Sequence, residues 1–160
     1  MESITQTTAA NVSYAIMNCH YVRYPFEYFL DSVKNFGFSN IELFGALPHF
    51  YIDDIDDALI DRVLTGCRQR GISIISYTPA QGAYPVSISI GEDNSRQRSI
   101  LMAKKCIDTA EKLGVPKMLI SPGFGYWNQP HEVRWHLCRE ALLELSKYAQ
   151  IHNVILMIEP

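Results

Sequence analysis

The chain has 160 residues, 48% of them hydrophobic, and a formal net charge of −3, values typical of one globular domain. The acidic balance and the lack of a Lys- or Arg-rich run argue against nucleic acid as a partner, because phosphate binding needs clustered basic side chains. No apolar stretch is long enough to cross a bilayer, and the polar start lacks a signal-peptide pattern. We therefore expect no membrane partner, a cytoplasmic location and a flexible N-terminal tail over residues 1–11.

In chain order, short β-rich runs alternate with amphipathic runs at helical spacing. The predicted strands cover residues 12–17, 40–44, 72–77, 117–121 and 154–159, and the helical runs cover residues 26–36, 59–67, 100–110 and 130–148. This order is typical of βαβ units with a parallel sheet. The runs IISYT and VILMIE are almost continuously apolar, which predicts strands that are buried on both faces.

Four cysteines are scattered without a CxxC pair: Cys19, Cys67, Cys106 and Cys138. This pattern indicates buried free thiols in a reducing compartment. Cys19, near a strand end, is the one with a functional alternative.

Polar and aromatic residues follow the predicted strands, at the place where parallel α/β folds bind ligands. The most informative is Glu159, since the run VILMIEP leads an apolar strand directly into a carboxylate. A carboxylate at such a strand end is costly to desolvate unless a cation or a donor receives it. Glu159 is thus a candidate metal ligand or proton-transfer base, and the alternative is a solvated strand-terminal glutamate.

Two histidines, His20 and His49, follow the first two strands, but their spacing matches no HxxxH or HExxH metal motif. Either could bind a ligand or lie on the surface. We interpret Glu42 as a buried, hydrogen-bonded carboxylate. The acidic run from Asp53 to Asp57 precedes a predicted helix, where carboxylates favour the positive end of the dipole, so we interpret it as helix capping rather than calcium binding.

Several chemistries have no sequence support. The chain contains no GxGxxG, GxxxxGK[ST] or GxSxG motif, which argues against a nucleotide-binding loop and a hydrolase nucleophile elbow.

Five segments together resemble the sugar phosphate isomerase/epimerase family with a xylose-isomerase-like TIM barrel. They are GFSNIELFG, YTPAQGAYPVSI, SIGEDNSRQRSI, AEKLGVPKMLISPG and VILMIEP. The resemblance implies the N-terminal five β/α units of a (β/α)8 barrel over residues 12–160, and thus an incomplete barrel, since a whole barrel has roughly 250 residues.

The resemblance also implies an isomerase that inverts C3 of a ketose or fructosamine with a divalent metal (Mn, Co, Mg, Zn or Ni) and glutamate-mediated proton transfer. Glu159 matches a catalytic and metal-binding glutamate of the family, and residues matching the substrate side of the barrel are His20, His49, Tyr77 and Trp127. The remaining metal ligands of the family lie beyond Pro160, so we expect an incomplete metal site and an inactive isolated chain.

Two other hypotheses remain at this point. The first is a noncatalytic half-barrel that self-associates, because an open sheet edge can pair with another chain; this agrees with an expected homo-oligomer. The second is a DNA-repair nuclease of the endonuclease IV type, which needs a histidine-rich metal site and a basic groove, and the sequence shows neither.

Overall fold

The computed structural model describes residues 13–82 and 86–159. The expected flexible tail, residues 1–11, and the first residue of the first predicted strand lie outside these ranges. In the described residues, five parallel strands form a sheet in the order β1-β2-β3-β4-β5. The strands are β1 (Ile16–Met17), β2 (Asn40–Gly45), β3 (Ser73–Pro79), β4 (Lys117–Ile120) and β5 (Ile155–Ile158). The predicted parallel α/β fold is confirmed.

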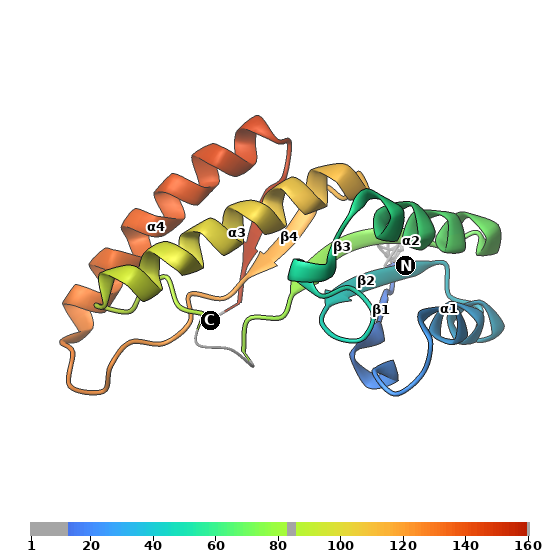
Figure 1. Cartoon of the computed structure of the whole chain (residues 1–160), viewed down its shortest axis with the longest axis horizontal. Coiled ribbons are helices and arrows are strands. Elements are labelled where there is room, and N and C mark those ends of the chain that lie inside the picture. The colour runs from blue at the N-terminus through green and yellow to red at the C-terminus, as the bar shows by residue number, and fades with distance from the viewer. Residues whose placement is uncertain (1–12, 83–85, 160) are drawn as a thin grey trace, which may run out of the picture.

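Four α-helices connect the strands and follow one another along the sheet (Figure 1). They are α1 (Phe26–Asn35), α2 (Asp57–Arg70), α3 (Asp93–Leu113) and α4 (His131–Ile151). Two 3₁₀ turns, η1 (Asn18–Tyr21) and η2 (Ile52–Asp54), lie after β1 and before α2. Because each of the first four strands is followed by a helix and then by a parallel neighbour, the chain forms successive β/α units.

The acidic run before α2 caps that helix through one residue, Asp56. Its side chain accepts a hydrogen bond from the Leu59 N–H at 2.7 Å, which satisfies a free donor of the first turn. Two other carboxylates of the run reach α3 instead: Lys105 Nζ lies 3.0 Å from Asp53 Oδ1, and Lys112 Nζ lies 2.8 Å from Asp57 Oδ1. Capping is therefore confirmed for Asp56, and Asp53 and Asp57 link neighbouring elements.

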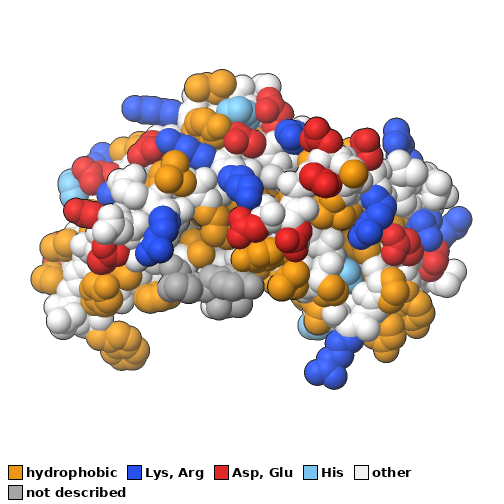
Figure 2. Space-filling model, in the orientation of Figure 1, with side chains coloured by type: hydrophobic (Ala, Val, Ile, Leu, Met, Phe, Trp, Pro, Cys, Tyr) orange, Lys and Arg blue, Asp and Glu red, His pale blue; other side chains and the backbone are white. Residues whose placement is uncertain are grey.

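Basic and acidic side chains are interleaved over the helix-covered surface (Figure 2). Ion pairs cross the seams between neighbouring helices, such as Lys104 of α3 with Glu144 of α4 at 2.6 Å. Exposed pairs of this kind contribute little to stability individually. No helix of the described residues is long and apolar enough to cross a membrane.

The register between β2 and β3 contains an irregularity that decides which side chains face the helices. Ile41 pairs with Ile74, but Glu42 pairs with Ser76, so Ile75 is left over as a bulge residue. Beyond the bulge, Leu43 aligns with Tyr77. Directly aligned residues of paired strands point to the same side of a sheet, and Leu43 is buried in the core cluster on the helix side. The bulge therefore places Tyr77 between the sheet and the helices.

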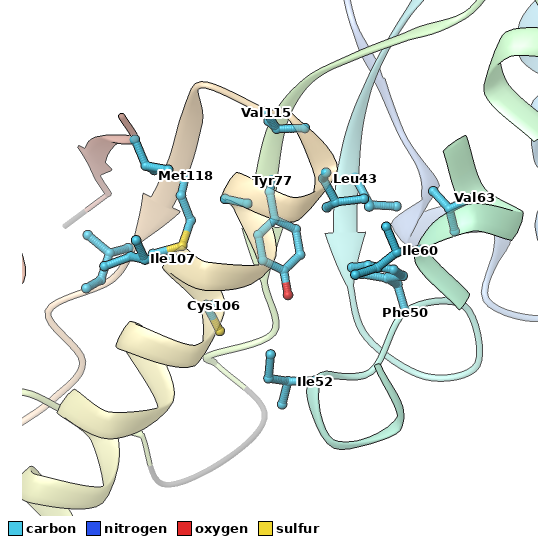
Figure 3. Close-up of a cluster of buried hydrophobic side chains, with 14 of the residues drawn as sticks. Leu43, Phe50, Ile52, Ile60, Val63, Tyr77, Cys106, Ile107, Val115 and Met118 are labelled. Carbon is cyan, nitrogen blue, oxygen red and sulfur yellow. The ribbon is translucent and has the colours of Figure 1, made fainter. Parts of the chain in front are cut away.

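The core lies in this layer and includes the buried side chains Ile41, Leu43, Phe50, Ile60, Val63, Tyr77, Ile107, Met118 and Ile120 (Figure 3). Tyr77 is fully buried and packs edge-on against Phe50, with 5.9 Å between ring centroids. Gly45 makes this possible, because a Cβ there would lie 2.7 Å from Tyr77 Cε2.

The Tyr77 hydroxyl ends beside the Cys106 thiol, a weak hydrogen-bond partner, and no nitrogen or oxygen atom of the described residues is bonded to it. Burial raises the pKa of Tyr77 well above its usual range and raises the pKa of Cys106 to about 12. All four cysteines are free thiols, as expected. Cys67, Cys106 and Cys138 are also buried as expected, whereas Cys19 is only half-buried.

The fifth strand differs from its prediction. Ile155 and Ile158 are more than half exposed, although the sequence indicated burial on both faces. β5 is the last strand of the sheet, and none of the described residues pairs with its outer edge. The prediction of a strand buried on both faces was therefore wrong for this chain.

The position of the buried Tyr77 hydroxyl predicts an unusual mutational result. Tyr77→Phe removes a buried polar atom whose only polar neighbour is a thiol, a weak hydrogen-bond partner, so the free energy of unfolding should stay the same or rise by up to about 1 kcal/mol. The control is Tyr148→Phe, which removes a hydrogen bond of 2.7 Å to Asp108 and should lower the free energy of unfolding by about 1 kcal/mol. Urea denaturation measures both. A larger loss for Tyr77→Phe than for Tyr148→Phe would show that the Tyr77 hydroxyl has a stabilising partner.

Candidate functional site

Polar side chains gather on the face of the sheet opposite the helices, which we call the inner face. Side chains alternate between the two faces along a strand. Glu42 lies between the core residues Ile41 and Leu43, and Thr78 follows the core residue Tyr77, so both side chains point to the inner face. On the other half of the sheet, Leu119 aligns with Met157, so Ser121 and Glu159, two residues further along each strand direction, share that face. The inner face thus carries two carboxylates and two hydroxyls near the carboxyl ends of four adjacent strands.

Glu159 follows β5 directly, and its backbone is fixed to the neighbouring strand. The Glu159 N–H donates to the Ile120 carbonyl at 3.1 Å, which continues the parallel pairing one residue past the strand. Its side chain is exposed. The sequence predicted this position correctly, at the carboxyl end of the fifth strand.

The second carboxylate, Glu42, accepts a hydrogen bond from the Thr78 hydroxyl. This bond joins β2 to β3 across the inner face, and Glu42 is half-buried. The interpretation of Glu42 as a hydrogen-bonded carboxylate is confirmed.

A metal site needs several ligands held together. Within residues 13–82 and 86–159, no group of three or more His, Cys, Asp or Glu side chains is arranged to hold a metal ion. Glu159 is one carboxylate, and one carboxylate does not fix a divalent ion in a defined geometry. The described residues therefore do not form a complete metal site.

The two predicted histidines occupy different environments on adjacent loops. His20 lies in η1 and is exposed. His49 is 3% exposed, and both of its ring nitrogens lie within hydrogen-bond distance of protein atoms: Nδ1 is 3.1 Å from Asn18 Nδ2, and Nε2 is 2.7 Å from the Tyr24 carbonyl. The structure therefore connects the two histidine loops through Asn18.

The two predicted aromatic residues, Tyr77 and Trp127, differ in their burial and in their place in the fold. Tyr77 faces the helix layer, as described above, and Trp127 is fully exposed on the loop between β4 and α4. Glu159 and Trp127 follow adjacent strands, whereas Tyr77 lies on the opposite side of the sheet from Glu159.

Sequence reasoning missed two side-chain amides that extend the sheet at its carboxyl end. Asn18 accepts from the Phe44 N–H at 2.6 Å and donates to the Phe44 carbonyl at 3.1 Å. Gln81 accepts from the Ser121 N–H at 3.0 Å and donates to the Leu119 carbonyl at 3.2 Å. Each amide supplies a donor and an acceptor, as a backbone peptide would. They bind backbone groups at the ends of β2 and β4, where the neighbouring strand no longer provides backbone hydrogen-bond partners.

The loops after β3 and β4 are bound to each other by buried serines. Ser87 Oγ donates to the Phe124 carbonyl at 2.5 Å, and Ser89 Oγ donates to the Pro122 carbonyl at 3.1 Å. Between these carbonyls, Gly123 has φ of +73°, and a Cβ there would lie 2.6 Å from Ser87 Cα. The contact therefore requires glycine, and it orders the loop that carries Trp127.

A pocket of about 700 Å³ lies between this loop and α4. Its lining includes Trp127, His131, Arg134, Trp135 and Ile158. Ile158 aligns with the core residue Ile120, so the pocket opens on the helix side of β5. It is separate from the inner face that carries Glu159.

The comparisons with known proteins agree with this architecture. The sequence model described as xylose isomerase-like TIM barrel matches residues 30–160. A curated relative, fructoselysine 3-epimerase of Shigella flexneri, is 29% identical over 145 residues, which are 91% of this chain and 52% of the relative. The chain therefore spans about half the length of this relative.

Solved structures show the same fold at lower identity. A putative xylose isomerase from Rhodospirillum rubrum superimposes with a TM-score of 0.80 at 17% identity, over 94% of this chain and 54% of that one. A D-psicose 3-epimerase crystallised with D-fructose gives a TM-score of 0.72 at 16% identity, over 92% and 52%. The described sheet and helices thus correspond to about half of a barrel, as expected.

The role of Gln81 can be tested by stability. Gln81→Met keeps the length of the side chain but leaves the Ser121 N–H and the Leu119 carbonyl without their partner, so the free energy of unfolding should fall by about 1–3 kcal/mol. Gln69→Met, at an exposed position of α2, is the matched control and should have an effect within about 0.5 kcal/mol. Equal effects of the two substitutions in urea denaturation would contradict the role assigned to Gln81.

Proposed function

Because the chain belongs to the xylose isomerase-like TIM barrel family, we propose that it is the N-terminal part of a sugar 3-epimerase that acts on a ketose or a fructosamine such as fructoselysine. The observation that carries the proposal is the position of Glu159, on the inner face at the carboxyl end of β5 and fixed to β4 by its backbone. The similarity to fructoselysine 3-epimerase over 91% of this chain supports the substrate class.

The proposed chemistry is a proton transfer at C3. The hydrogen on C3 of a 2-ketose is acidic because the adjacent carbonyl delocalises the resulting charge as an enediolate. A carboxylate such as Glu159 can take this proton as a general base. Inversion then requires that a proton return to the opposite face of C3 from a second group. The described residues place no second carboxylate next to Glu159, so we assign only the first step to this chain.

Residues on the loops that follow β1 and β4, at the same end of the sheet, supply the proposed substrate contacts. His20 and Trp127 are exposed on the loops after β1 and β4, where a sugar hydroxyl could accept or donate a hydrogen bond and a ring face could cover an apolar sugar face. Direct contacts from His49 and Tyr77 stay predictions. Their burial means that substrate could reach them only if neighbouring groups moved.

The divalent metal and the cytoplasmic location also stay predictions. Ligands from outside the described residues would have to join Glu159 to complete a metal site. No step of the proposed proton transfer is assigned to the metal.

Activity tests the role of Glu159. Fused to the part of the Shigella flexneri relative that lies beyond the match, this chain should epimerise fructoselysine, and Glu159→Gln should lower kcat by about 10²–10⁴-fold, the usual contribution of a general base. The control, Glu132→Gln, lies at an exposed position of α4 and should leave kcat unchanged. A folded Glu159→Gln variant with full activity would contradict the proposal.

Metal binding tests the expected incompleteness of the site. Calorimetric titration of the chain with Mn²⁺ or Co²⁺ should show no site with a Kd below about 100 µM, because a lone carboxylate binds divalent ions weakly. Micromolar binding that Glu159→Gln abolishes would show that the chain forms a complete site.

A second candidate role, self-association as a noncatalytic half-barrel, is favoured by one specific observation. The outer edge of β5 and the adjoining side of α4 expose apolar side chains together, among them Trp135, Leu143, Ile155 and Ile158. Unpaired strand edges and exposed apolar patches of this kind promote association. A homo-oligomer is therefore the partner that we propose for the isolated chain.

Light scattering after size-exclusion chromatography measures this association. At tens of micromolar the chain should elute as a dimer or larger species, and Ile158→Lys should shift it to monomer by placing a charge in the interface. Leu101→Lys changes a similarly exposed residue of α3 and should leave the species unchanged. A wild-type monomer at these concentrations would refute the second role.

A further inference from the structure

We propose that Asn18 and His49 form a latch that holds the loop of residues 18–25 against the end of β2, with His49 in its neutral Nε2–H form. Both side chains are buried, at 1% and 3% exposure. The latch connects two segments that lie apart in the sequence: residues 18–25, which contain η1 and the turn before α1, and the end of β2 with the loop after it. The statement that these segments face the substrate rests on the proposed function, whereas the hydrogen bonds of the latch do not depend on it.

The Phe44 N–H fixes the orientation of the Asn18 amide. A backbone N–H can only donate, so the atom of Asn18 that lies 2.6 Å from the Phe44 N–H must be the acceptor Oδ1. Nδ2 is then the atom that faces the Phe44 carbonyl at 3.1 Å and His49 Nδ1 at 3.1 Å. The two hydrogens of the NH₂ group match these two acceptors.

The protonation of His49 follows from this orientation. Because Asn18 Nδ2 donates, His49 Nδ1 must accept and carries no hydrogen. The Tyr24 carbonyl can only accept, so Nε2, 2.7 Å away, must carry the hydrogen and donate it. Groups of fixed polarity at the two ends, the Phe44 N–H and the Tyr24 carbonyl, therefore select one tautomer of the ring.

The latch positions the loop rather than touching a ligand. His20 lies two residues after Asn18, and Tyr24 supplies the carbonyl that His49 holds. The exposed ring of Tyr24 stacks on Tyr28, with 4.7 Å between centroids. His20 and the Tyr24 ring are thus held at the carboxyl end of β1 by a buried contact that a substrate need not reach. We assign Asn18 and His49 as positioning residues.

Protonation of His49 would open the latch, because two donors would then face each other at Asn18 Nδ2 and His49 Nδ1. The groups packed on the ring are uncharged: Asn18, the Tyr24 carbonyl and the ring of Phe26, at 5.5 Å between centroids.

Long-range ¹H–¹⁵N NMR of the chain tests the assignment directly, with no need for activity. His49 should show a protonated Nε2 and an unprotonated Nδ1 at neutral pH. The exposed His131 at the start of α4 makes no hydrogen bond or ion pair with the described residues, so it provides an internal comparison in which neither neutral tautomer is selected. An Nδ1–H tautomer at His49, or a mixture of both tautomers there, would overturn the proposal.

Substitution of Asn18 provides a second, independent test. Asn18→Asp keeps the acceptor for the Phe44 N–H but replaces the donor that faces His49 by a carboxylate oxygen, so His49 Nδ1 should carry a hydrogen in this variant. A role limited to filling space would leave the tautomer unchanged. Persistence of the neutral Nε2–H form in a folded Asn18→Asp variant would overturn the proposal.

The positioning role has its own measurement. Asn18→Ala should raise the hydrogen-exchange rate of the amides of residues 20–24 by at least about tenfold relative to those of α3, since the three hydrogen bonds of the Asn18 side chain are lost. The matched control, Asn128→Ala, changes an exposed asparagine and should leave these rates unchanged. Unaltered exchange in Asn18→Ala, together with a confirmed tautomer, would show that the latch exists but does not hold the loop. Activity enters none of these tests, so a failure of the proposed function would not affect their results.

Discussion

The structure depends on the register between β2 and β3, and in particular on the extra residue at Ile75. Up to the bulge Ile41 pairs with Ile74, and beyond it Leu43 pairs with Tyr77. Because side chains alternate along a strand, a shift of one residue moves every later side chain to the opposite face. The bulge therefore places Tyr77 in the core and, next to it, Thr78 on the inner face, where its hydroxyl reaches Glu42.

At the carboxyl end of the sheet, side chains replace backbone as hydrogen-bond partners. Asn18 and Gln81 each present an amide to the neighbouring strand, and the serines at 87 and 89 bind the carbonyls of the next loop. Side-chain partners let the chain turn away from the sheet while its last peptide groups remain satisfied. The loops that carry His20 and Trp127 begin from these fixed points, which connects the architecture of the sheet to the proposed substrate side of the fold.

Much of the fold could be predicted from the sequence. The alternation of β-rich and amphipathic runs identified all five strands and four helices, and Glu159 was located from the apolar run that precedes it. The burial of β5 was predicted wrongly. Apolar composition indicates that a strand is suited to a buried position, but none of the described residues covers the outer edge of β5. The resemblance implied a substrate contact for Tyr77, which stays a prediction; its burial against the helices could not be predicted, because a bulge within an apolar run leaves no mark in the sequence. Long-range contacts, such as that of Asn18 with His49, are equally invisible to local patterns.

The measurement that tests this account most directly is the pairing of β2 with β3 in solution. Interstrand NMR contacts between backbone protons should link Leu43 with Tyr77 and Phe44 with Thr78, as the bulged register requires. Tyr77 ring protons should in turn contact Phe50. Contacts that link Phe44 with Tyr77 instead would mean a register without the bulge, with Tyr77 on the inner face beside Glu42, and would contradict the arrangement of the site described above.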